Sequence, residues 1–537
     1  MTHPSIIICL ALSICLPVSG DDPVIIDGQF MEWNDSHLEW IGPAGDSNAI
    51  DFLKLWIRDE AQRLYIAVEA SEDFDLSENN DVTLLLDTDN NAATGLASEG
   101  IGAEIRFLLG QRTGSFYPSP TTNPNSGIQI WHSDISFEAA PTVTSTTFEI
   151  SIDLEARIKD IELFTGSSFA MVMNEPNGNR IPILGEGIEF QLGNSSEPPA
   201  VDSDFEKDLQ SDIRLVSWNV KFDTIFEDDE SPKFERILTA IQPDVINFQE
   251  IYNNSTNEVR DLVEDWLTLS QGDWYAAGNN DCKTVSKFPI LYSQALSGNL
   301  AVLLDTTSVL KRTLLIINAH TPCCGNDEGR QEEIDEMLQL VREVREGSHS
   351  NIPSDCALQI TGDLNLVGLA QQLESLIDGN IINEDLYGPD VNMDVDGSDL
   401  LDTLPTHTQQ RTTYTWRNDF SSFWPGRLDC SVISDSVLEL GRSFVIETRS
   451  MSAERLAQYQ LDILDSSASD HLPLVTDVRI PGTNTRVGDL NNDGSVDGAD
   501  LGIFLNAWNT STEAADFDGD GTVGGADLGI LLLNWNS

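Results

Sequence analysis

The region from residue 213 to about 480 alternates strand-length apolar runs with helical segments, and this alternation limits the fold most strongly. The apolar runs read IRLVSWNV, PDVINFQEI, NLAVLLD, TLLIINAH, ALQITGDLN and RLDCSVIS. Between them, KFERILTAI and RQEEIDEMLQLVREVR have helical period and helix-forming composition. The region is also long enough to bury a substantial core. It therefore predicts a mixed α/β domain.

Polar residues of a particular kind interrupt or end these strand runs. Within ITGDLNLVG, residues 360–368, Asp363 and Asn365 stand two apart and so share one face of a strand. Taken alone, such a cluster is typical of a turn. The same interruption recurs in the other runs, at Asn219, Glu250, Asn318, His320, Asp429, Asp470 and His471. Because buried polar groups need a partner or a metal, together they predict one site.

The motifs around these residues run through the whole region: S-W-N, Q-E, N-x-H, G-D-x-N, R-x-D and S-D-H, with VSKFPI at 285–290. In this combination residues 213–480 resemble the endonuclease/exonuclease/phosphatase superfamily, which includes secreted DNases, abasic-site nucleases, sphingomyelinases and inositol-phosphate phosphatases. The resemblance implies a DNase-like, four-layer α/β sandwich of two packed sheets flanked by helices. It also implies an enzyme, a metal-dependent phosphoester hydrolase.

The resemblance implies metal ligands among the matched residues. Glu250 is the expected carboxylate ligand of Mg²⁺ (or Mn²⁺), a hard cation that needs only one or two protein oxygens. Asn219 would complete or support that site, and Asp470 would hold a second metal. The cation would polarise a phosphoryl oxygen during in-line attack by water.

The resemblance implies that the histidines transfer protons. His471 is the expected general base for water, and Asp429 would orient its ring and stabilise the imidazolium. His320 would contact the phosphate or protonate the departing oxygen.

The resemblance also implies a role for the polar residues at 360–368. Asp363 and Asn365 would orient the attacking water and bind the phosphoryl oxygens, while Gly362 would allow a close approach of backbone and substrate. Three further residues are candidates to line the substrate groove, with packing or a surface ion pair as an equal alternative: Arg330, Tyr414 and Trp416.

The substrate is less constrained than the chemistry. The region carries roughly 19 Lys and Arg against roughly 45 Asp and Glu, a weak platform for a nucleic-acid backbone. Pancreatic-type DNases are acidic too, so charge does not settle the substrate. Secretion beside a sugar-binding-like module suggests scavenging of extracellular nucleic acid or organophosphate, and an extracellular nuclease acting on DNA or RNA is the favoured interpretation. The alternatives are a phospholipid or sugar-phosphate phosphoesterase, or a non-catalytic scaffold or adhesion protein.

Residues 21–195 predict an all-β sandwich, because β-rich runs such as RLYIAVEA and DVTLLLD are separated by Gly, Asn and Asp turns. The opening IDGQFMEWND with LLLDTDNNAATG resembles family-9-like carbohydrate-binding modules, which implies a sugar ligand. Asp87, Asp89 and Asn91 alternate like calcium ligands, with a solvated Asx turn as the alternative. Aromatic residues could stack on sugar or fill the core: Trp33, Trp40 and Trp56.

The last fifty residues contain an internal repeat. DLNNDGSVDGADLGIFLNAWN returns 27 residues later as DFDGDGTVGGADLGILLLNWN. Its acidic positions are spaced as in EF-hand loops: Asp489, Asn491, Asp493, Asp497 and Asp500, then Asp516, Asp518, Asp520 and Asp527. Residues 488–537 resemble dockerin domains, which implies bound Ca²⁺ and a cohesin-like scaffold partner. Gly524 replaces the acid at Asp497, so the second site would be weaker; a calcium-folded tail without a partner is the alternative.

The remaining features concern organisation and location. At 537 residues the chain predicts three or four domains. Residues 1–20 have the apolar core and small residues of a secretory signal, and no later run would span a bilayer. Polar segments at 196–212 and 481–487 predict linkers. The protein is therefore expected to be secreted or attached to a cell surface.

Charge and cysteine content add two limits. A net charge of −60 argues against passive polyanion binding but not against an enzyme that holds its own metal. Cys9 and Cys15 would leave with the signal. Five cysteines remain, so at least one thiol is unpaired within the chain: Cys282, Cys323, Cys324, Cys356 and Cys430. Cys323 and Cys324 lack zinc-site spacing, which favours structural pairing over metal binding.

Overall fold

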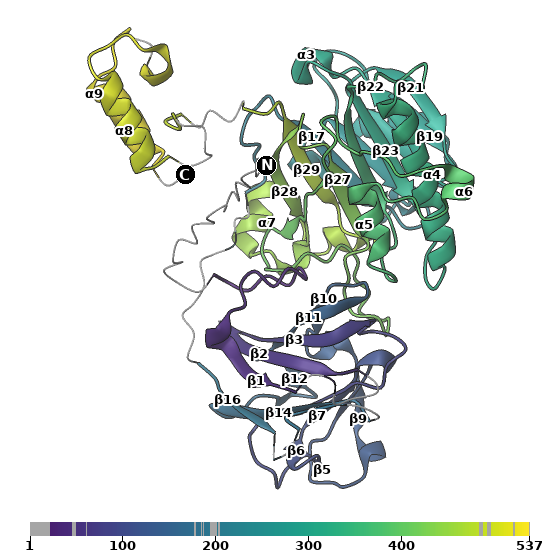
Figure 1. The fold of residues 1–537 in the computed structure, drawn as a ribbon, viewed down its shortest axis with the longest axis vertical. Coiled ribbons are helices and arrows are strands. Elements are labelled where there is room, and N and C mark those ends of the chain that lie inside the picture. Colours follow the sequence, from purple (N-terminus) through teal and green to yellow (C-terminus); the bar gives the residue numbers. More distant parts are fainter. Residues whose placement is uncertain are drawn as a thin grey trace, which may run out of the picture.

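The computed structural model describes residues 22–43, 45, 50–60, 62–176, 179–183, 185, 187–193, 201, 204–482, 487–490, 496–518 and 521–535. Figure 1 shows a β-rich domain in purple and blue beneath a larger mixed α/β domain in teal and green, with a small helical tail in yellow. The predicted signal segment 1–20 lies outside the described residues, as do parts of both predicted linkers.

Two sheets share one core in the N-terminal β domain. The first has the order β1-β2-β3-β11-β10, with the bounds β1 Leu38–Ile41, β2 Phe52–Glu60, β3 Arg63–Phe74, β10 Glu138–Ala140 and β11 Ser145–Asp153. The second has the order β15-β14-β4-β7-β8-β9, with β16 beside β14. Its bounds are β4 Thr83–Asp87, β7 Ile105–Leu108, β8 Thr113–Phe116, β9 Ile128–Ile130, β14 Ser168–Asn174, β15 Arg180–Ile181 and β16 Ile188–Gln191. Two short hairpins lie outside these sheets: β5 Leu96–Ser98 with β6 Ile101–Ala103, and β12 Arg157–Ile158 with β13 Ile161–Glu162.

Alternation along these strands explains the core. Ile66, Phe148, Leu84 and Phe107 come from four strands of the two sheets and are buried together, because alternate side chains of a strand point to the same face. Trp33 is also buried, and its indole nitrogen donates to Glu149 at 2.7 Å. Packing therefore accounts for this tryptophan.

The mixed domain contains two further sheets. One has the order β19-β20-β18-β17-β29-β28-β26, with the bounds β17 Ile213–Asn219, β18 Val245–Gln249, β19 Tyr275–Asn279, β20 Cys282–Ser286, β26 Thr406–His407, β28 Glu439–Val445 and β29 Leu474–Arg479. The other has the order β21-β22-β23-β24-β27-β25. Its bounds are β21 Ile290–Ala295, β22 Leu300–Leu304, β23 Leu314–His320, β24 Ala357–Asp363, β25 Leu401–Asp402 and β27 Asp429–Ile433. Leu215 and Val245 of the first sheet share a buried cluster with Val302 and Ile316 of the second.

Helices cover the opposite faces of these sheets. On the sheet that contains β17, residues of α1 (Ser231–Ile241) and α2 (Thr256–Trp266) pack with α7 (Ala453–Tyr459) nearby. On the sheet that contains β24, residues of α4 (Asp327–Arg345) and α5 (Gln371–Asp378) do so. The short helices are α3 Thr307–Leu310 and α6 Glu384–Tyr387. The segments predicted as helical lie in α1 and α4, so the predicted mixed α/β organisation is confirmed at this level.

Strand direction brings the predicted polar residues to one edge. β17 and β18 are parallel, with Asn219 opposite Gln249. β23 and β24 are also parallel, and the last residues of both strands, His320 and Asp363, lie opposite each other. β27 runs antiparallel to β24 and begins at Asp429, opposite Asp363. The ends of strands from both sheets therefore meet where the apolar runs stop.

A loop of the mixed domain is inserted into the N-terminal core. Trp424 is only 6% exposed and belongs to the β-domain cluster. Its ring lies 5.1 Å from Phe137 and 6.4 Å from Phe107, measured between ring centroids. Beside it, the Arg112 guanidinium lies 3.8 Å from the centre of the Phe423 ring. The two domains thus share a hydrophobic core.

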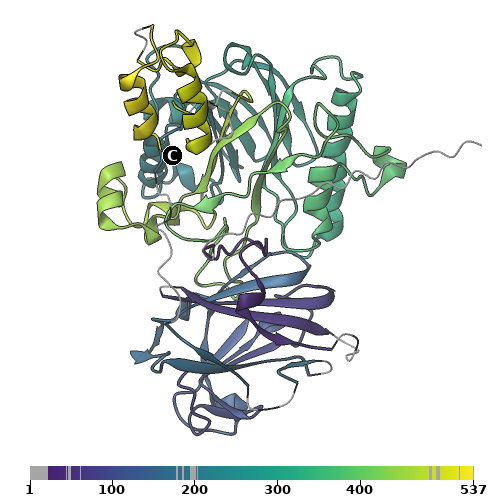
Figure 2. The same cartoon turned by 60° about the vertical axis from the view of Figure 1, so that its left-hand side comes forward.

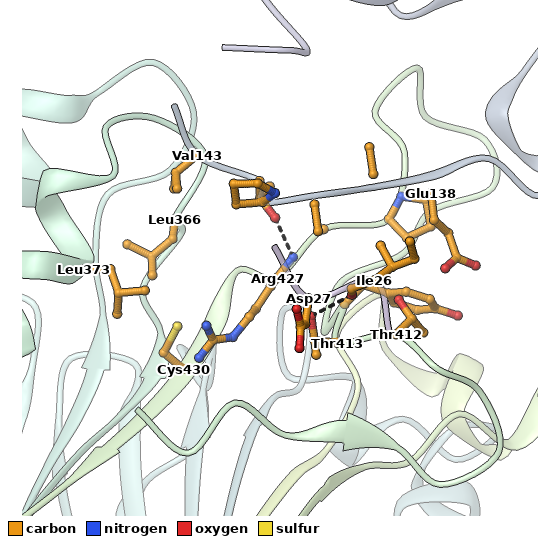
Figure 3. A pocket seen from close by; sticks show the side chains of 17 residues that line it. Ile26, Asp27, Glu138, Val143, Leu366, Leu373, Thr412, Thr413, Arg427 and Cys430 are labelled. Carbon is orange, nitrogen blue, oxygen red and sulfur yellow. Dashed lines mark hydrogen bonds between the residues drawn. The ribbon is translucent and has the colours of Figure 1, made fainter. Parts of the chain in front are cut away.

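Backbone hydrogen bonds tie the same junction together. The Ile26 amide donates to the Arg411 carbonyl at 2.9 Å, and the Thr413 amide donates to the Ile26 carbonyl at 3.2 Å. The Arg427 amide donates to Thr142 Oγ1 at 2.8 Å. Figure 3 shows Ile26, Thr413 and Arg427 around a small cavity of about 50 Å³ between the domains. Figure 2 shows the β domain directly below the mixed domain from a second direction.

The C-terminal tail has a small core of its own. It consists of α8 (Gly498–Ala507) and α9 (Gly525–Leu533), with Phe504 and Leu531 buried between them. In the described part of the chain, no helix combines the length and the apolar character needed to cross a bilayer.

Truncating the inserted tryptophan tests the shared core. Trp424→Ala should lower the free energy of unfolding by about 3 to 5 kcal/mol, because it leaves a cavity in a packed core. Calorimetry should record a lower midpoint than in the wild type. Phe420→Ala is the control, since Phe420 lies in the same loop and is 98% exposed. Equal midpoints for the two variants would contradict the shared core.

Candidate functional site

An asparagine holds two carboxylates together at the centre of the site. Asn219 Nδ2 donates to Glu250 Oε1 at 3.0 Å and to Asp363 Oδ2 at 2.9 Å. Its own oxygen accepts from the Lys221 amide at 2.9 Å. Glu250 also accepts from the Phe222 amide at 2.9 Å. Asn219 therefore holds the two carboxylates in position. Support of the metal site was one of the two roles expected of Asn219.

The first histidine of the site forms a buried pair. His471 Nδ1 lies 2.8 Å from Asp429 Oδ2, and its Nε2 lies 3.5 Å from Asp363 Oδ2. The Trp218 indole donates to the His471 carbonyl at 3.0 Å and anchors its backbone. The imidazole is thus held at one nitrogen and presents the other to the carboxylate cluster.

The second histidine has a partner that the sequence did not reveal. His320 Nδ1 lies 2.5 Å from Asp281 Oδ2, and its Nε2 lies 3.7 Å from Asp363 Oδ2. Asp281 also accepts from the Glu250 amide at 3.1 Å. Asp281 precedes β20 in GNNDC, which is indistinguishable from an ordinary turn in the sequence. Its role becomes visible only from the position of His320.

The stretch at 360–368 is partly as expected. Asp363 Oδ1 accepts from the Asn365 amide at 3.0 Å, and Asn365 Nδ2 donates to the Thr321 carbonyl at 2.9 Å. Gly362 has φ +145°, and a Cβ there would lie 1.9 Å from the Ala319 carbonyl oxygen. The glycine therefore serves the expected close approach of backbone, here that of β23, and the expected approach of substrate stays a prediction.

Burial and neighbouring carboxylates shift the histidine pKa values. Burial opposes a charge on His471, but Asp429 and Asp363 outweigh it and raise the pKa to about 10. Burial also opposes a charge on His320, and Asp281 with Asp363 raises its pKa to about 9. Burial raises the pKa of the Asp429 carboxyl. The carboxylates thus create a strongly negative environment.

Two groups of side chains have ligand atoms close enough to share a cation. Glu250, His320 and Asp363 form one group, and Asp363, Asp429 and His471 form the other, each with ligand atoms within 4.8 Å. Carboxylate oxygens are the donors that Mg²⁺ prefers, so Glu250 and Asp363 fit this ion. Asp470 is in neither group, and its carboxylate lies 3.7 Å from Lys221 Nζ. Its expected second metal stays a prediction.

Except for the buried Asp429, these residues form the floor of a cleft of about 480 Å³. Trp416 and Arg330 line it, as the sequence suggested. Arg330 is buried and donates to the Cys324 carbonyl at 2.6 Å, which holds the adjoining loop. Tyr414 is absent from the described lining, and its ring packs at a tilt against His407, with 4.2 Å between ring centroids. Of the two expectations for Tyr414, packing therefore holds, because its side chain points into the core.

The five cysteines in the described part of the chain are free thiols. Cys323 and Cys324 are exposed and line the cleft, whereas Cys282, Cys356 and Cys430 are buried. The structural pairing favoured for Cys323 and Cys324 is therefore not formed.

An acidic cluster in the β domain lies apart from the cleft. Asp87, Asp89 and Glu104 have oxygens within 4.8 Å of one another. Burial and the nearby aspartates raise the pKa of Glu104 to about 7. Asn91 takes part through its backbone amide, which donates to Asp87 at 2.8 Å. Glu104 thus replaces Asn91 in the side-chain set that the sequence suggested.

The C-terminal loops retain part of the predicted calcium set. Asp516, Asp518 and Asp527 have oxygens within 4.8 Å of one another. Asp500 accepts from the Leu490 amide at 2.7 Å and from the Asp497 amide at 2.8 Å. Three predicted ligands lie outside the described residues: Asn491, Asp493 and Asp520.

Comparisons with known proteins agree with the sequence motifs. Residues 487–532 match the family described as the dockerin type I domain, which confirms the predicted tail. Three solved structures overlap with about half of this chain: the human Nocturnin catalytic domain with bound sulfate anion (15% identity, 52% of this chain, 99% of that chain, TM-score 0.32), TDP2 from C. elegans (16%, 51%, 77%, 0.34) and an endonuclease/exonuclease/phosphatase family protein from Leptotrichia buccalis (15%, 50%, 99%, 0.32). At these scores the similarity by itself assigns no activity to this chain. A search of curated proteins finds no match to the sequence.

Calcium removal tests the tail. Segment 488–537 should be largely disordered in EDTA and gain helix on adding Ca²⁺, because the three clustered aspartates repel one another and a core below about 70 residues rarely suffices. Far-UV circular dichroism measures the gain. Asp516→Ala should reduce the gain of helix on adding Ca²⁺ by damaging the second loop, and Asp489→Ala should reduce it by damaging the first. Helix content that is indifferent to Ca²⁺ would contradict the calcium-binding interpretation.

Proposed function

We propose that this protein is a secreted, Mg²⁺-dependent phosphoester hydrolase whose catalytic domain, residues 213–480, has the four-layer DNase-like fold. The observation that supports it is that Glu250, Asp363 and two histidines line the floor of one cleft, with Asn219 bonded to both carboxylates and each histidine paired with a further aspartate behind the floor. A carboxylate cluster beside two oriented imidazoles suits metal-assisted attack of water on a phosphoryl group.

Glu250 and Asp363 would hold the cation, and Asn219 would keep both carboxylates in place through its two hydrogen bonds. Bound Mg²⁺ supplies polarisation of the phosphoryl oxygen and partial neutralisation of charge. Asn365, beside Asp363 in the cleft, would contact the phosphoryl oxygens.

His471 would accept the proton of the attacking water at Nε2. Asp429 holds the Nδ1 side at 2.8 Å and so selects the tautomer with a free Nε2. Asp429 contributes most to the raised pKa of His471, and the charge of Asp363 adds to it. A cation on Asp363 would offset that charge and bring the imidazole into the range in which it accepts a proton.

His320 would act as the proton donor or as a contact to the phosphate. The hydrogen bond with Asp281, which is not one of the two carboxylates assigned to the cation, contributes most to raising the pKa of His320 against the effect of burial, and it fixes the ring from the opposite side. The two imidazoles thus lie beside Asp363 and would have different roles: His471 would accept a proton, and His320 would donate one or contact the phosphate.

The other predictions remain proposals of the same kind. The tail would attach the enzyme to a cohesin-like scaffold, supported by exposed apolar side chains on its helices, such as Leu505 and Leu533. Carbohydrate binding by the β domain has weak support, because Trp33 and Trp56 are buried. The phosphoester bond to be cleaved occurs in nucleic acid, which the sequence favours, and also in phospholipid head groups and sugar phosphates. The substrate depends on which of these molecules the cleft admits.

An assay panel tests the proposed reaction. Purified protein should hydrolyse at least one of plasmid DNA, RNA, sphingomyelin and bis-p-nitrophenyl phosphate with Mg²⁺, and EDTA should abolish the turnover because the carboxylates then lack their cation. Absence of metal-dependent turnover on every substrate would favour the rival, a non-catalytic scaffold protein.

Replacement of the proposed base tests its role. His471→Ala should lower kcat by about 10² to 10⁴, the usual contribution of a general base, without loss of folded structure. Asp429→Asn should also lower kcat, because it disturbs the tautomer. His349→Ala is the control, since His349 contacts Gln294 and Tyr292 outside the cleft. A near-wild-type rate in His471→Ala would refute the assignment.

A further inference from the structure

We propose that the N-terminal β domain forms part of the active site and restricts it to compact phosphoesters. The substrate class would be one phosphoryl group on an uncharged, partly apolar organic portion, and the interior of a nucleic-acid duplex would be excluded. This inference rests on the proposed function, because it concerns the substrate of the same site.

The first support is the composition of the cleft wall. The floor of the cleft belongs to the mixed domain, but the wall of the cleft belongs to the β domain. This wall consists of Asp75, Glu78, Asn79, Thr142 and Thr144. A substrate on the catalytic floor therefore lies against side chains from a domain that begins almost two hundred residues earlier in the chain.

The wall is fixed in position. The Thr144 amide donates to the Gly368 carbonyl at 2.9 Å, and Thr144 Oγ1 accepts from the Ala370 amide at 3.1 Å. Gly368 itself lines the cleft, so these bonds join its two sides. The buried Trp424 adds a hydrophobic anchor. Such an interface, with a shared core, does not behave as a flexible tether between domains.

The anchoring loop also leads directly to the catalytic floor. Trp416 forms a β-bridge with His471 at one end of this loop, and Trp424 enters the β-domain core at the other. The position of the wall is therefore coupled to the proposed general base through one short segment.

Charge in the cleft disfavours a polyanion. Its acidic lining consists of Asp75, Glu78, Glu250, Asp327, Asp363 and Asp470. Besides the two histidines of the floor, the described lining has Lys221 and Arg330 as basic residues, and each of these two lies beside a carboxylate: Lys221 at 3.7 Å from Asp470 and Arg330 in an ion pair with Asp327 at 2.5 Å. Duplex binding depends on Lys and Arg that neutralise several phosphates, and this lining offers few.

Size and polarity favour a compact organic ligand. A volume of about 480 Å³ lies within the range of roughly 300–1,000 Å³ that is usual for small-molecule sites. Apolar side chains occupy much of the lining, including Phe222, Leu369, Trp416, Phe423 and Leu428. They would cover the organic portion while the floor engages a single phosphoryl group.

Substrate comparison on the full-length protein with Mg²⁺ is the first test. We expect kcat/KM for bis-p-nitrophenyl phosphate to exceed that for plasmid DNA, per bond, by about 100-fold or more, since unfavourable charge and exclusion act together. Plasmid cleavage as fast as small-ester hydrolysis would overturn the inference and leave the proposed function intact. Metal-dependent turnover of neither would instead remove the proposed function.

Wall variants test the charge argument without relying on turnover. The double variant Asp75→Asn/Glu78→Gln keeps the side-chain shapes and removes two charges from the wall. It should raise the affinity for a short fluorescent DNA duplex, measured by anisotropy at low salt, by about tenfold. Glu72→Gln/Asp73→Asn is the matched control, because these residues are exposed on β3 outside the lining. Equal duplex binding by both double variants would overturn the role of the wall.

Discussion

The buried carboxylate of Asp363 is the constraint on which the rest of this site depends. It is 1% exposed, at the end of the central strand β24, and Asn219, His320 and His471 all approach its Oδ2 atom. A buried charge without such neighbours would be strongly destabilising. The surrounding strand ends therefore carry hydrogen-bond donors. The two histidines among these donors would transfer protons at the same point where the Asp363 carboxylate would bind a cation.

The position of the catalytic pair depends in turn on a loop that the two domains share. Thr415 Oγ1 accepts from the Asp429 amide at 2.9 Å, and the Leu472 amide donates to the Thr415 carbonyl at 2.7 Å. A few residues later the same loop places Trp424 in the core of the β domain. The β domain thus supports the geometry of the pair Asp429–His471 as well as the wall of the cleft, which distinguishes it from an appended binding module.

Acidity links the three parts of the molecule. The net charge of −60 is spread over the domains, and local clusters of carboxylates lie in the β domain, in the cleft and in the C-terminal loops. Each cluster concentrates like charges that a divalent cation would offset. The tail and the cleft therefore both gain from a medium rich in divalent ions, although for different reasons: folding in the first and chemistry in the second.

The sequence by itself determined the order of the parts and most of the residues that the structure brings together at the cleft. Strand runs, the helices α1 and α4, and the calcium repeat all have local periods, and local periods can be detected without knowing the fold. Polar residues at strand ends, such as Glu250, His320 and Asp429, stand out because they break apolar runs. The tertiary structure alone decided which partners these residues meet. Asp281 has no pattern of its own, Tyr414 points inward despite its place in the motif region, and Trp424 packs on Phe107 from more than three hundred residues away. Contacts between distant segments follow from how the sheets and domains pack, and no local pattern records them.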